Sequence, residues 1–270
     1  QGFEVDLAPV DSNEIVKLDA LAALIRPDTI LVSVMAVNNE IGAIQPLQEI
    51  ANLLENQPKI SFHVDAVQAI GKLMPADMLP ERVDFATFSA HKFHGPRGVG
   101  FVYIKEGKKL QPLLSGGGQE QNQRSTTENV AGIAATAKAL RLFLSEIAHK
   151  QEKIQAMKSV LMAALEAYSD VVIFSQTENF IPNILTFGIK GVRGEVLVHG
   201  FEAHNIYIST TSACSSKAGV ASSTLGAMNI SPRVATSAVR ISLDASNNMA
   251  EIEQFLTIFK QLHEKFQKIT

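Results

Sequence analysis

Polar side chains gather where short apolar runs of this sequence end, as in "DFATFSAHKFHGPRGVGFVYIK", where Ser89, His91 and Lys92 close a run. Such runs are typical of buried strands, and ligands of open α/β sheets bind beyond the carboxyl ends of the strands. We therefore expect these polar groups to form one site. The candidate residues are Asn38, Asp65, Gln68, Ser89, His91 and Lys92.

A carboxylate, an amide, a hydroxyl and a lysine in one site suit pyridoxal phosphate chemistry. A carboxylate that faces the pyridinium nitrogen keeps it protonated, and a lysine amine forms a Schiff base with the ring aldehyde. On this hypothesis Asp65 faces the ring nitrogen and Lys92 forms the Schiff base. The remaining assignments are Gln68 and Asn38 to the ring hydroxyl, and Ser89 and His91 to the phosphate.

Each cluster taken alone also has a structural interpretation. Asn38 could cap a following helix, His63 could be a core histidine, and Lys92 could simply be solvated. Other motifs are weaker: "GPRGVG" precedes a strand and is not G-x-G-x-x-G, and "GGGQ" lacks the end of a phosphate-binding loop. "HKFH" has no third ligand nearby, so we expect no metal site.

Two further residues stand out from their surroundings. Cys214 lies in "ISTTSACSSKAG", where small and hydroxyl residues indicate a loop and favour a reactive thiol over a buried structural one. Arg240 lies inside the apolar run "SAVRISL". A buried guanidinium requires an anion, either a substrate carboxylate or an internal Asp or Glu.

Composition limits the class of protein. The 270 residues are 46% hydrophobic, carry a net charge of −3 and show no long basic run, which argues against nucleic acid and membrane partners. One cysteine cannot form an internal disulfide, so we expect a cytoplasmic protein. The chain opens with "QGFEVDLAPVD" and no initiator methionine, which we interpret as strand and as the mark of a fragment or processed product.

Hydrophobic periodicity predicts alternating strands and helices. Apolar runs at 29–37, 60–66, 83–89 and 98–105 predict buried strands of a mostly parallel sheet, and 45–56 has the spacing of a helix. From about 127 to 169 the pattern is helical. The remainder predicts a smaller α+β domain that ends in a helix with Ile252, Phe255, Leu256 and Phe259 on one face.

These motifs together resemble a known family. "VSVMAVNNEIGAIQPL", "FHVDAVQAIGK", "SAHKFHGPRGVGFVYIK", "GGGQEQNQRSTTENVAGI", "ISTTSACSS" and "VRISL" occur in the order found in cysteine desulfurases of the NifS/IscS-like group. That group belongs to the class V aminotransferases. The resemblance spans nearly the whole chain and implies a fold type I pyridoxal phosphate enzyme: a partial large α/β domain with helices on both faces of its sheet (1–140) and a small α+β domain (141–270).

The resemblance also implies roles and partners. Lys92 would be the Schiff-base lysine, Asp65 the partner of the ring nitrogen, and Cys214 the thiol that takes sulfur from L-cysteine, leaving alanine and a persulfide. Arg240 and Asn38 would bind the substrate. Thr127 in "RSTTEN" would complete the phosphate site of a second subunit, which implies a homodimer, and a sulfur-acceptor protein for iron-sulfur cluster or tRNA thiolation pathways would receive the sulfur.

The sequence departs from the family at three places. Thr126 and Thr211 stand where the family usually has glycine, which predicts a stiffer cysteine loop because β-branched residues avoid positive φ. About a hundred residues that family members carry before "GFEVDLAPV" are also missing. Two alternatives therefore stay open: a related class V enzyme such as a selenocysteine lyase or aminotransferase, and an inactive truncated fragment.

Overall fold

The computed structural model describes residues 2–145, 147–211 and 222–267. The chain divides into two compact units, which we name after their sheets. The β1–β4 unit comprises Arg26–Ala36 and Pro46–Ile147, and the β5–β8 unit comprises Gln1–Ile25, Val37–Gln45 and Ala148–Thr270. The expected division into domains at 140 stays a prediction.

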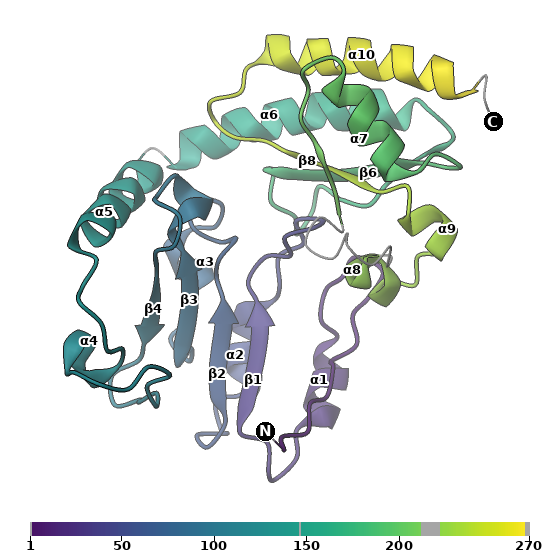
Figure 1. The fold of residues 1–270 in the computed structure, drawn as a ribbon. Helices are drawn as coiled ribbons and strands as arrows, with labels where there is room; N and C mark the ends of the chain where they lie inside the picture. Colours follow the sequence, from purple (N-terminus) through teal and green to yellow (C-terminus); the bar gives the residue numbers. More distant parts are fainter. Residues whose placement is uncertain (1, 146, 212–221, 268–270) are drawn as a thin grey trace. The chain divides into compact units, whose positions relative to one another are not determined.

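The β1–β4 unit contains a four-stranded sheet in the order β1-β2-β3-β4 (Figure 1). Strands β1, β2 and β3 are parallel, and β4 pairs antiparallel with β3. The elements are β1 (Leu31–Met35), α2 (Leu47–Leu53), β2 (Ser61–Asp65), α3 (Pro75–Met78), β3 (Phe85–Ser89), the 3₁₀ helix η1 (Ala90–Phe93), β4 (Gly100–Ile104), α4 (Gln119–Asn122) and α5 (Val130–Leu144).

The two faces of this sheet differ in burial. Strands alternate their side chains between faces, so Phe62, Val64 and Ala86 share one face and are completely buried. The other face carries Ser33, which is exposed, and His63, which is half-buried. The predicted β-helix-β arrangement is confirmed, since parallel β1 and β2 are joined by a segment that contains α2.

Two predictions about strands are wrong. Strand β4 is the antiparallel member of the expected mostly parallel sheet, but the expectation that it is buried is wrong, because Phe101, Val102 and Tyr103 are exposed. The sequence also predicts a strand at the start of the chain, but residues 2–9 form no strand. Next to them, an isolated bridge joins Val10 to Val16. An alternating apolar pattern does not reveal whether a neighbour covers each face.

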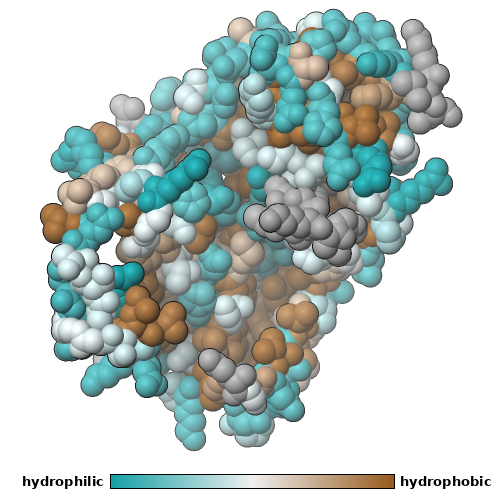
Figure 2. Space-filling model, viewed as in Figure 1, coloured by the Kyte–Doolittle hydropathy of each residue, from teal (hydrophilic) through white to brown (hydrophobic). Residues whose placement is uncertain are grey.

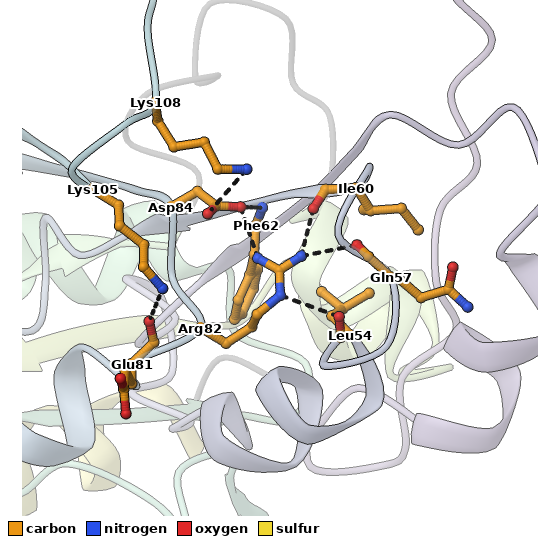
Figure 3. A network of polar contacts seen from close by, with 9 residues as sticks. All are labelled: Leu54, Gln57, Ile60, Phe62, Glu81, Arg82, Asp84, Lys105 and Lys108. Atoms are coloured by element: carbon orange, nitrogen blue, oxygen red, sulfur yellow. Dashed lines mark hydrogen bonds and ion pairs between the residues drawn. The ribbon is translucent and has the colours of Figure 1, made fainter.

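A buried ion cluster fixes the start of β3 against the start of β2 (Figure 3). The Asp84 carboxylate accepts hydrogen bonds from the Phe62 N–H at 2.9 Å and Arg82 Nη1 at 2.8 Å, and Lys108 Nζ lies 3.2 Å away. Burial alone would raise the pKa of Asp84, but these hydrogen bonds and the Arg82 charge lower it overall. Arg82 also donates to the carbonyl oxygens of Leu54, Gln57 and Ile60.

The β5–β8 unit has a four-stranded antiparallel sheet in the order β5-β6-β8-β7. Its elements are α1 (Leu18–Leu24), α6 (Ile147–Glu166, whose first residue belongs to the other unit), β5 (Val171–Ile173), β6 (Ile184–Ile189), α7 (Gly194–Glu202), β7 (Ser209–Thr210), α8 (Ser223–Ala227), α9 (Pro232–Ala235), β8 (Val239–Ser242) and α10 (Met249–Gln267).

The core of this unit forms between the sheet and the long helices α6, α7 and α10 (Figure 1). Phe187 of the central strand β6 contacts Phe255 and Phe259 of α10 edge to face. The predicted apolar face of the last helix is confirmed, because Ile252, Phe255 and Phe259 are buried and Leu256 packs against the same core. Within the described residues, no helix combines the length and apolar character that crossing a membrane requires.

Candidate active site

In the β1–β4 unit, the predicted site residues follow the carboxyl ends of two adjacent parallel strands. Asp65 ends β2 and is in register with Thr87 of β3, and Ser89 ends β3. His91 and Lys92 come next, in η1. Parallel strands place these ends at the same edge of the sheet, as the sequence predicted.

The turn after Ser89 has a local cause in the sequence. Helix η1 ends at Phe93, and the residue that caps it, His94, has a φ of 63°. Gly95 then passes close to Ala90, since a Cβ on Gly95 would lie 2.8 Å from the Ala90 Cβ. This compact turn requires glycine, and it leaves His91 and Lys92 exposed while Phe93 is buried.

The groups at this edge have few competing partners. Asp65 Oδ1 accepts a hydrogen bond from the Val67 N–H at 3.0 Å, the only hydrogen bond to this carboxylate among the described residues. Gln68 is buried, and its Oε1 accepts a hydrogen bond from Lys72 Nζ. The Asp65 carboxylate and the exposed Lys92 ammonium are therefore available to a ligand.

His63 links the three parallel strands laterally. Its Nδ1 lies 2.8 Å from Ser33 Oγ on β1, and its Nε2 lies 3.3 Å from Thr87 Oγ1 on β3. Burial lowers the pKa of His63, although the negative charge of Asp65 acts in the opposite direction. This geometry favours a structural role for His63, as the alternative interpretation held.

In the β5–β8 unit, Asn38 organises a tight turn. Its Oδ1 accepts hydrogen bonds from the N–H groups of Glu40 at 2.8 Å and Ile41 at 3.0 Å. Its Nδ2 donates to Thr224 Oγ1 of α8 at 3.3 Å. Asn38 therefore folds its own turn and does not cap a helix, and its side chain is buried.

The turn also holds Arg240 and the start of α8. Arg240 Nη1 donates to the Asn39 carbonyl oxygen at 2.7 Å, which places this guanidinium beside the residue after Asn38. Glu40 accepts a hydrogen bond from the hydroxyl of Ser222, the N-cap residue of α8. The structure thus places Arg240 of β8 against the turn that contains Asn38, the other predicted substrate-binding residue.

Among the described residues, no hydrogen bond joins Thr127 to these groups. Thr127 is exposed in the segment between α4 and α5. Cys214 lies outside the described residues. Thr126 and Thr211 have no positive φ, so neither takes the conformation in which threonine would be strained in place of glycine.

The side chains present fit pyridoxal phosphate by their chemistry. A carboxylate, a hydroxyl, an imidazole and an accessible ammonium follow neighbouring strand ends, and they belong to Asp65, Ser89, His91 and Lys92. In the described part of the chain, no group of three or more His, Cys, Asp and Glu side chains could hold a metal ion. Whether all the predicted residues act in one site stays a prediction.

Sequence reasoning missed the distant partners of the turn at Asn38 and Glu40. Thr224 accepts a hydrogen bond from Asn38 and Ser222 donates one to Glu40, yet both are far from this turn in the sequence and stand in no recognisable motif with it. A run such as "DSNEIV" signals a turn, but only the folded structure shows what that turn contacts.

Comparison with known proteins identifies the family. Residues 1–255 match the model of aminotransferase class-V, and the chain belongs to this family of pyridoxal phosphate enzymes. The chain is 48% identical to the "NifS/IcsS protein homolog" of Lactobacillus delbrueckii subsp. bulgaricus, covering 99% of this chain and 70% of the relative. It is 37% identical to "Cysteine desulfurase IscS" of Dictyoglomus turgidum, covering 100% of this chain and 68% of the relative.

Solved structures support the same fold. A "NIFS-LIKE PROTEIN" is 38% identical with a TM-score of 0.88, covering 97% of this chain and 69% of that one. A NifS-like protein from Rickettsia africae is 30% identical with a TM-score of 0.85, covering 95% and 69%. The predicted family, fold type I architecture and cofactor class are confirmed, and the chain spans about 70% of the length of these relatives.

Proposed function

We propose that this protein is a cysteine desulfurase that removes sulfur from L-cysteine and leaves L-alanine. The observation that carries the proposal is the set of groups at the edge of the β1–β4 sheet, where Asp65 and Lys92 follow adjacent strand ends with few competing partners. Relatives named cysteine desulfurase at 37% identity over the whole chain support the choice of substrate.

Different residues hold different parts of the cofactor and the substrate. With pyridoxal phosphate bound, Asp65 would hold the ring nitrogen, Lys92 would bond to the aldehyde, and Ser89 and His91 would hold the phosphate. Gln68 and Asn38 would hold the ring hydroxyl, and the Arg240 guanidinium would bind the substrate carboxylate. When bound, pyridoxal phosphate supplies an electron sink for the substrate carbon.

Cys214 is the residue that takes the sulfur from the substrate. Its thiolate attacks the substrate sulfur, so that a sulfur-sulfur bond forms on Cys214 and the carbon-sulfur bond breaks. The electron pair of the broken bond stays with the substrate carbon, which takes up a proton to give alanine. A sulfur-acceptor protein in a reducing compartment then receives the terminal sulfur of the persulfide.

The proposal also includes that the protein is a homodimer. Helix α5 is rich in apolar residues, yet Val130 is 71%, Ile133 45% and Leu142 53% exposed, and Leu113 before it is 97% exposed. Hydrophobic residues reach the surface at several places on the face seen in Figure 2. Exposed apolar residues gathered on one helix favour a protein interface, and Thr127 lies just before this helix.

The test compares Cys214→Ser with the parent protein in assays of alanine and sulfide formation from cysteine, with Ser215→Ala, at the adjacent residue, as the matched control. Cys214→Ser should form no persulfide and release no sulfur, yet retain the absorbance of bound cofactor, whereas the control keeps all three properties. Sulfide release by Cys214→Ser at the parental rate would refute the role of this thiol.

The dimer is tested by complementation. If Thr127 acts in the site of the other subunit, mixing Lys92→Ala with Thr127→Ala subunits restores one intact site in each mixed dimer. Activity of the mixture well above that of either variant alone supports the shared site. Activity no higher than the variants, in a mixture shown by mass to contain mixed dimers, contradicts it.

A further inference from the structure

The imidazole of His63 extends along the sheet of the β1–β4 unit toward Asp65, the residue that ends the same strand. On β3 the partner of His63 in register is Phe85, whereas Asp65 is in register with Thr87. The ring nevertheless reaches past Phe85, because His63 Nε2 lies 3.3 Å from Thr87 Oγ1. The imidazole is therefore displaced along β2 in the direction of Asp65.

His63 and Asp65 also share one face of the sheet. Side chains alternate between the faces of a strand, so residues two apart point to the same side, with Cα atoms about 6–7 Å apart. Ser33 of β1 is in register with His63, and its Oγ lies 2.8 Å from His63 Nδ1. The face that carries Asp65 thus also carries an imidazole held between two hydroxyl groups.

The two hydroxyl groups let this imidazole change its charge without losing its partners. A neutral imidazole donates from one ring nitrogen and accepts at the other, whereas the cation donates from both. A hydroxyl group can donate or accept, so Ser33 and Thr87 can partner either form of His63. Protonation of His63 therefore changes the charge beside Asp65 while the link between the three strands stays in place.

The Asp65 carboxylate has no cationic partner among the described residues. It accepts one hydrogen bond, from the Val67 N–H at 3.0 Å, and none from His63. Burial lowers the pKa of His63, and the Asp65 charge acts in the opposite direction. The titratable residues that follow β3, His91 and Lys92 in η1, are not among the charges that shift it. His63 is thus neutral at neutral pH and takes up a proton as the solution becomes acidic.

We propose that His63 is a positioning residue that leaves the Asp65 carboxylate free for a cationic ring nitrogen. Neutral His63 adds no charge to this face, so Asp65 attracts the ring nitrogen of pyridoxal phosphate at full strength. Protonated His63 takes the place of that cation and weakens the attraction. By linkage, a ring nitrogen on Asp65 must also lower the affinity of His63 for its proton. The identity of the ligand rests on the proposed function, whereas the coupling of His63 to Asp65 is a property of the protein without ligand.

The first measurement needs no cofactor. The imidazole C–H resonances of His63, identified by their loss in His63→Gln, are followed by NMR between about pH 4.5 and 8.5. Asp65→Asn should lower the midpoint of this titration, because the charge that favours the imidazolium is removed. Glu55→Gln, at an exposed position after α2, is the control and should leave the midpoint unchanged.

Thr87→Val tests the geometry itself. Valine resembles threonine in shape but has no hydroxyl, so the imidazole loses the partner that holds it toward Asp65. In this background Asp65→Asn should shift the His63 midpoint less than it does in the parent protein. Ser33→Ala removes the partner on the other side of the ring and should retain the full shift. Equal shifts in both backgrounds would show that the contact with Thr87 does not carry the coupling.

The second measurement is the affinity for pyridoxal phosphate, recorded by absorbance at several pH values. Relative to His63→Gln, the parent protein should lose affinity roughly three- to tenfold as the pH falls from about 7.5 to about 5, because the imidazolium competes for Asp65. Bound pyridoxal phosphate should also lower the His63 midpoint. This last shift is measured in the parent protein and needs no variant at His63.

The outcomes separate this proposal from the proposed function. A His63 midpoint that is the same in the parent protein and in Asp65→Asn overturns the coupling. A midpoint that does not respond to bound pyridoxal phosphate, with equal pH dependence of affinity in the parent protein and His63→Gln, overturns the role in cofactor binding. Absence of any pyridoxal phosphate binding, with the midpoint still lower in Asp65→Asn, overturns the proposed function and leaves the coupling of His63 to Asp65 supported.

Discussion

The two units differ in how they combine stability with chemistry. In the β1–β4 unit the buried ion cluster of Asp84 lies at the start of β3, while the reactive groups lie beyond the opposite end of that strand. Lys92 is exposed and has no hydrogen bond among the described residues. In the β5–β8 unit, by contrast, the predicted ligand groups Asn38 and Arg240 belong to the hydrogen-bond network that holds their turn.

This difference predicts different responses to substitution. Where chemistry and stability are separated along a strand, a site residue can be replaced without loss of the fold. Where one side chain both binds the ligand and holds the fold, its substitution must change activity and stability together. The β1–β4 unit thus presents accessible groups, and the β5–β8 unit presents groups that hydrogen bonds already hold in place.

The largest effect is expected for Lys92→Ala, which should lower desulfurase activity roughly 10³-fold or more because the amine that carries the cofactor is lost. Its free energy of unfolding should stay within about 0.5 kcal/mol of the parent value, since the side chain is exposed. Activity assays and urea unfolding measure the two quantities, with the exposed Lys109→Ala as control. Borohydride trapping that labels a lysine other than Lys92 would contradict the assignment.

Asp84→Asn should show the reverse pattern. Removing the charge leaves Arg82 without its buried partner and should cost about 2–4 kcal/mol of unfolding free energy. The pKa of Asp84 is lower in the folded protein than in the unfolded chain. Its contribution to the free energy of unfolding is therefore fully present above the unfolded pKa of about 3.9 and is lost as the pH falls through the folded pKa. The surface pair is the control: Asp28→Asn, with Asp28 79% exposed, should cost little. Equal losses in both variants would contradict a special role for the buried cluster.

Much of the β1–β4 fold could be predicted because local pattern and packing agree. The apolar β-branched runs became β1 and β2, and the spacing of Leu47, Ile50 and Ala51 became the buried face of α2. Strand β4 could not be predicted in full, because a period of two cannot say that its neighbour runs antiparallel or that both of its faces are exposed.

The candidate site was predictable to the extent that it follows strand ends. Asp65, Ser89 and Lys92 come from consecutive strands, so the topology of a parallel sheet brings their positions to one edge. The contact of Asn38 with Thr224 depends on how distant segments pack, which no local spacing encodes. Arg240 was recognised as needing a partner, but the backbone carbonyl of Asn39 was not foreseen.

Arg240→Lys should change stability and substrate binding together. Lysine keeps the charge but not the planar fork, so both the contact with the Asn39 carbonyl and a paired contact with a carboxylate are weakened. We expect a loss of about 1–2 kcal/mol in unfolding free energy and a KM for cysteine raised roughly tenfold, with a smaller change in kcat. Arg233→Lys, at an exposed position of α9, is the control. A change in KM without any change in stability would show that the two roles are separable.

The smallest effect concerns Lys158 of α6, which is only 1% exposed and donates from Nζ to the carbonyl oxygens of Gln176 at 3.1 Å and Ile181 at 3.0 Å. Burial lowers its pKa from 10.5 to about 8. Between these values the unfolded chain binds the proton more readily than the folded one, so stability should rise with pH in that window. Relative to Lys158→Met, the parent should gain about 1–2 kcal/mol between about pH 8 and pH 10.

Lys158 also tests whether the network around Asn38 extends into the core of its unit. The segment that Lys158 holds pairs with the turn after Asn38, because the Ile181 N–H donates to the Gly42 carbonyl at 2.9 Å and the Ile44 N–H donates to that of Asn179 at 2.8 Å. Lys158→Met deprives two carbonyl groups of their donor, so amide hydrogen exchange at Ile44 and Ile181 should accelerate. Lys260→Met, at an exposed position of α10, should leave both rates unchanged. Unchanged exchange at Ile44 and Ile181 in Lys158→Met would confine the network to the turn itself and make the preorganisation of Asn38 a local property of residues 38–41 and their direct partners.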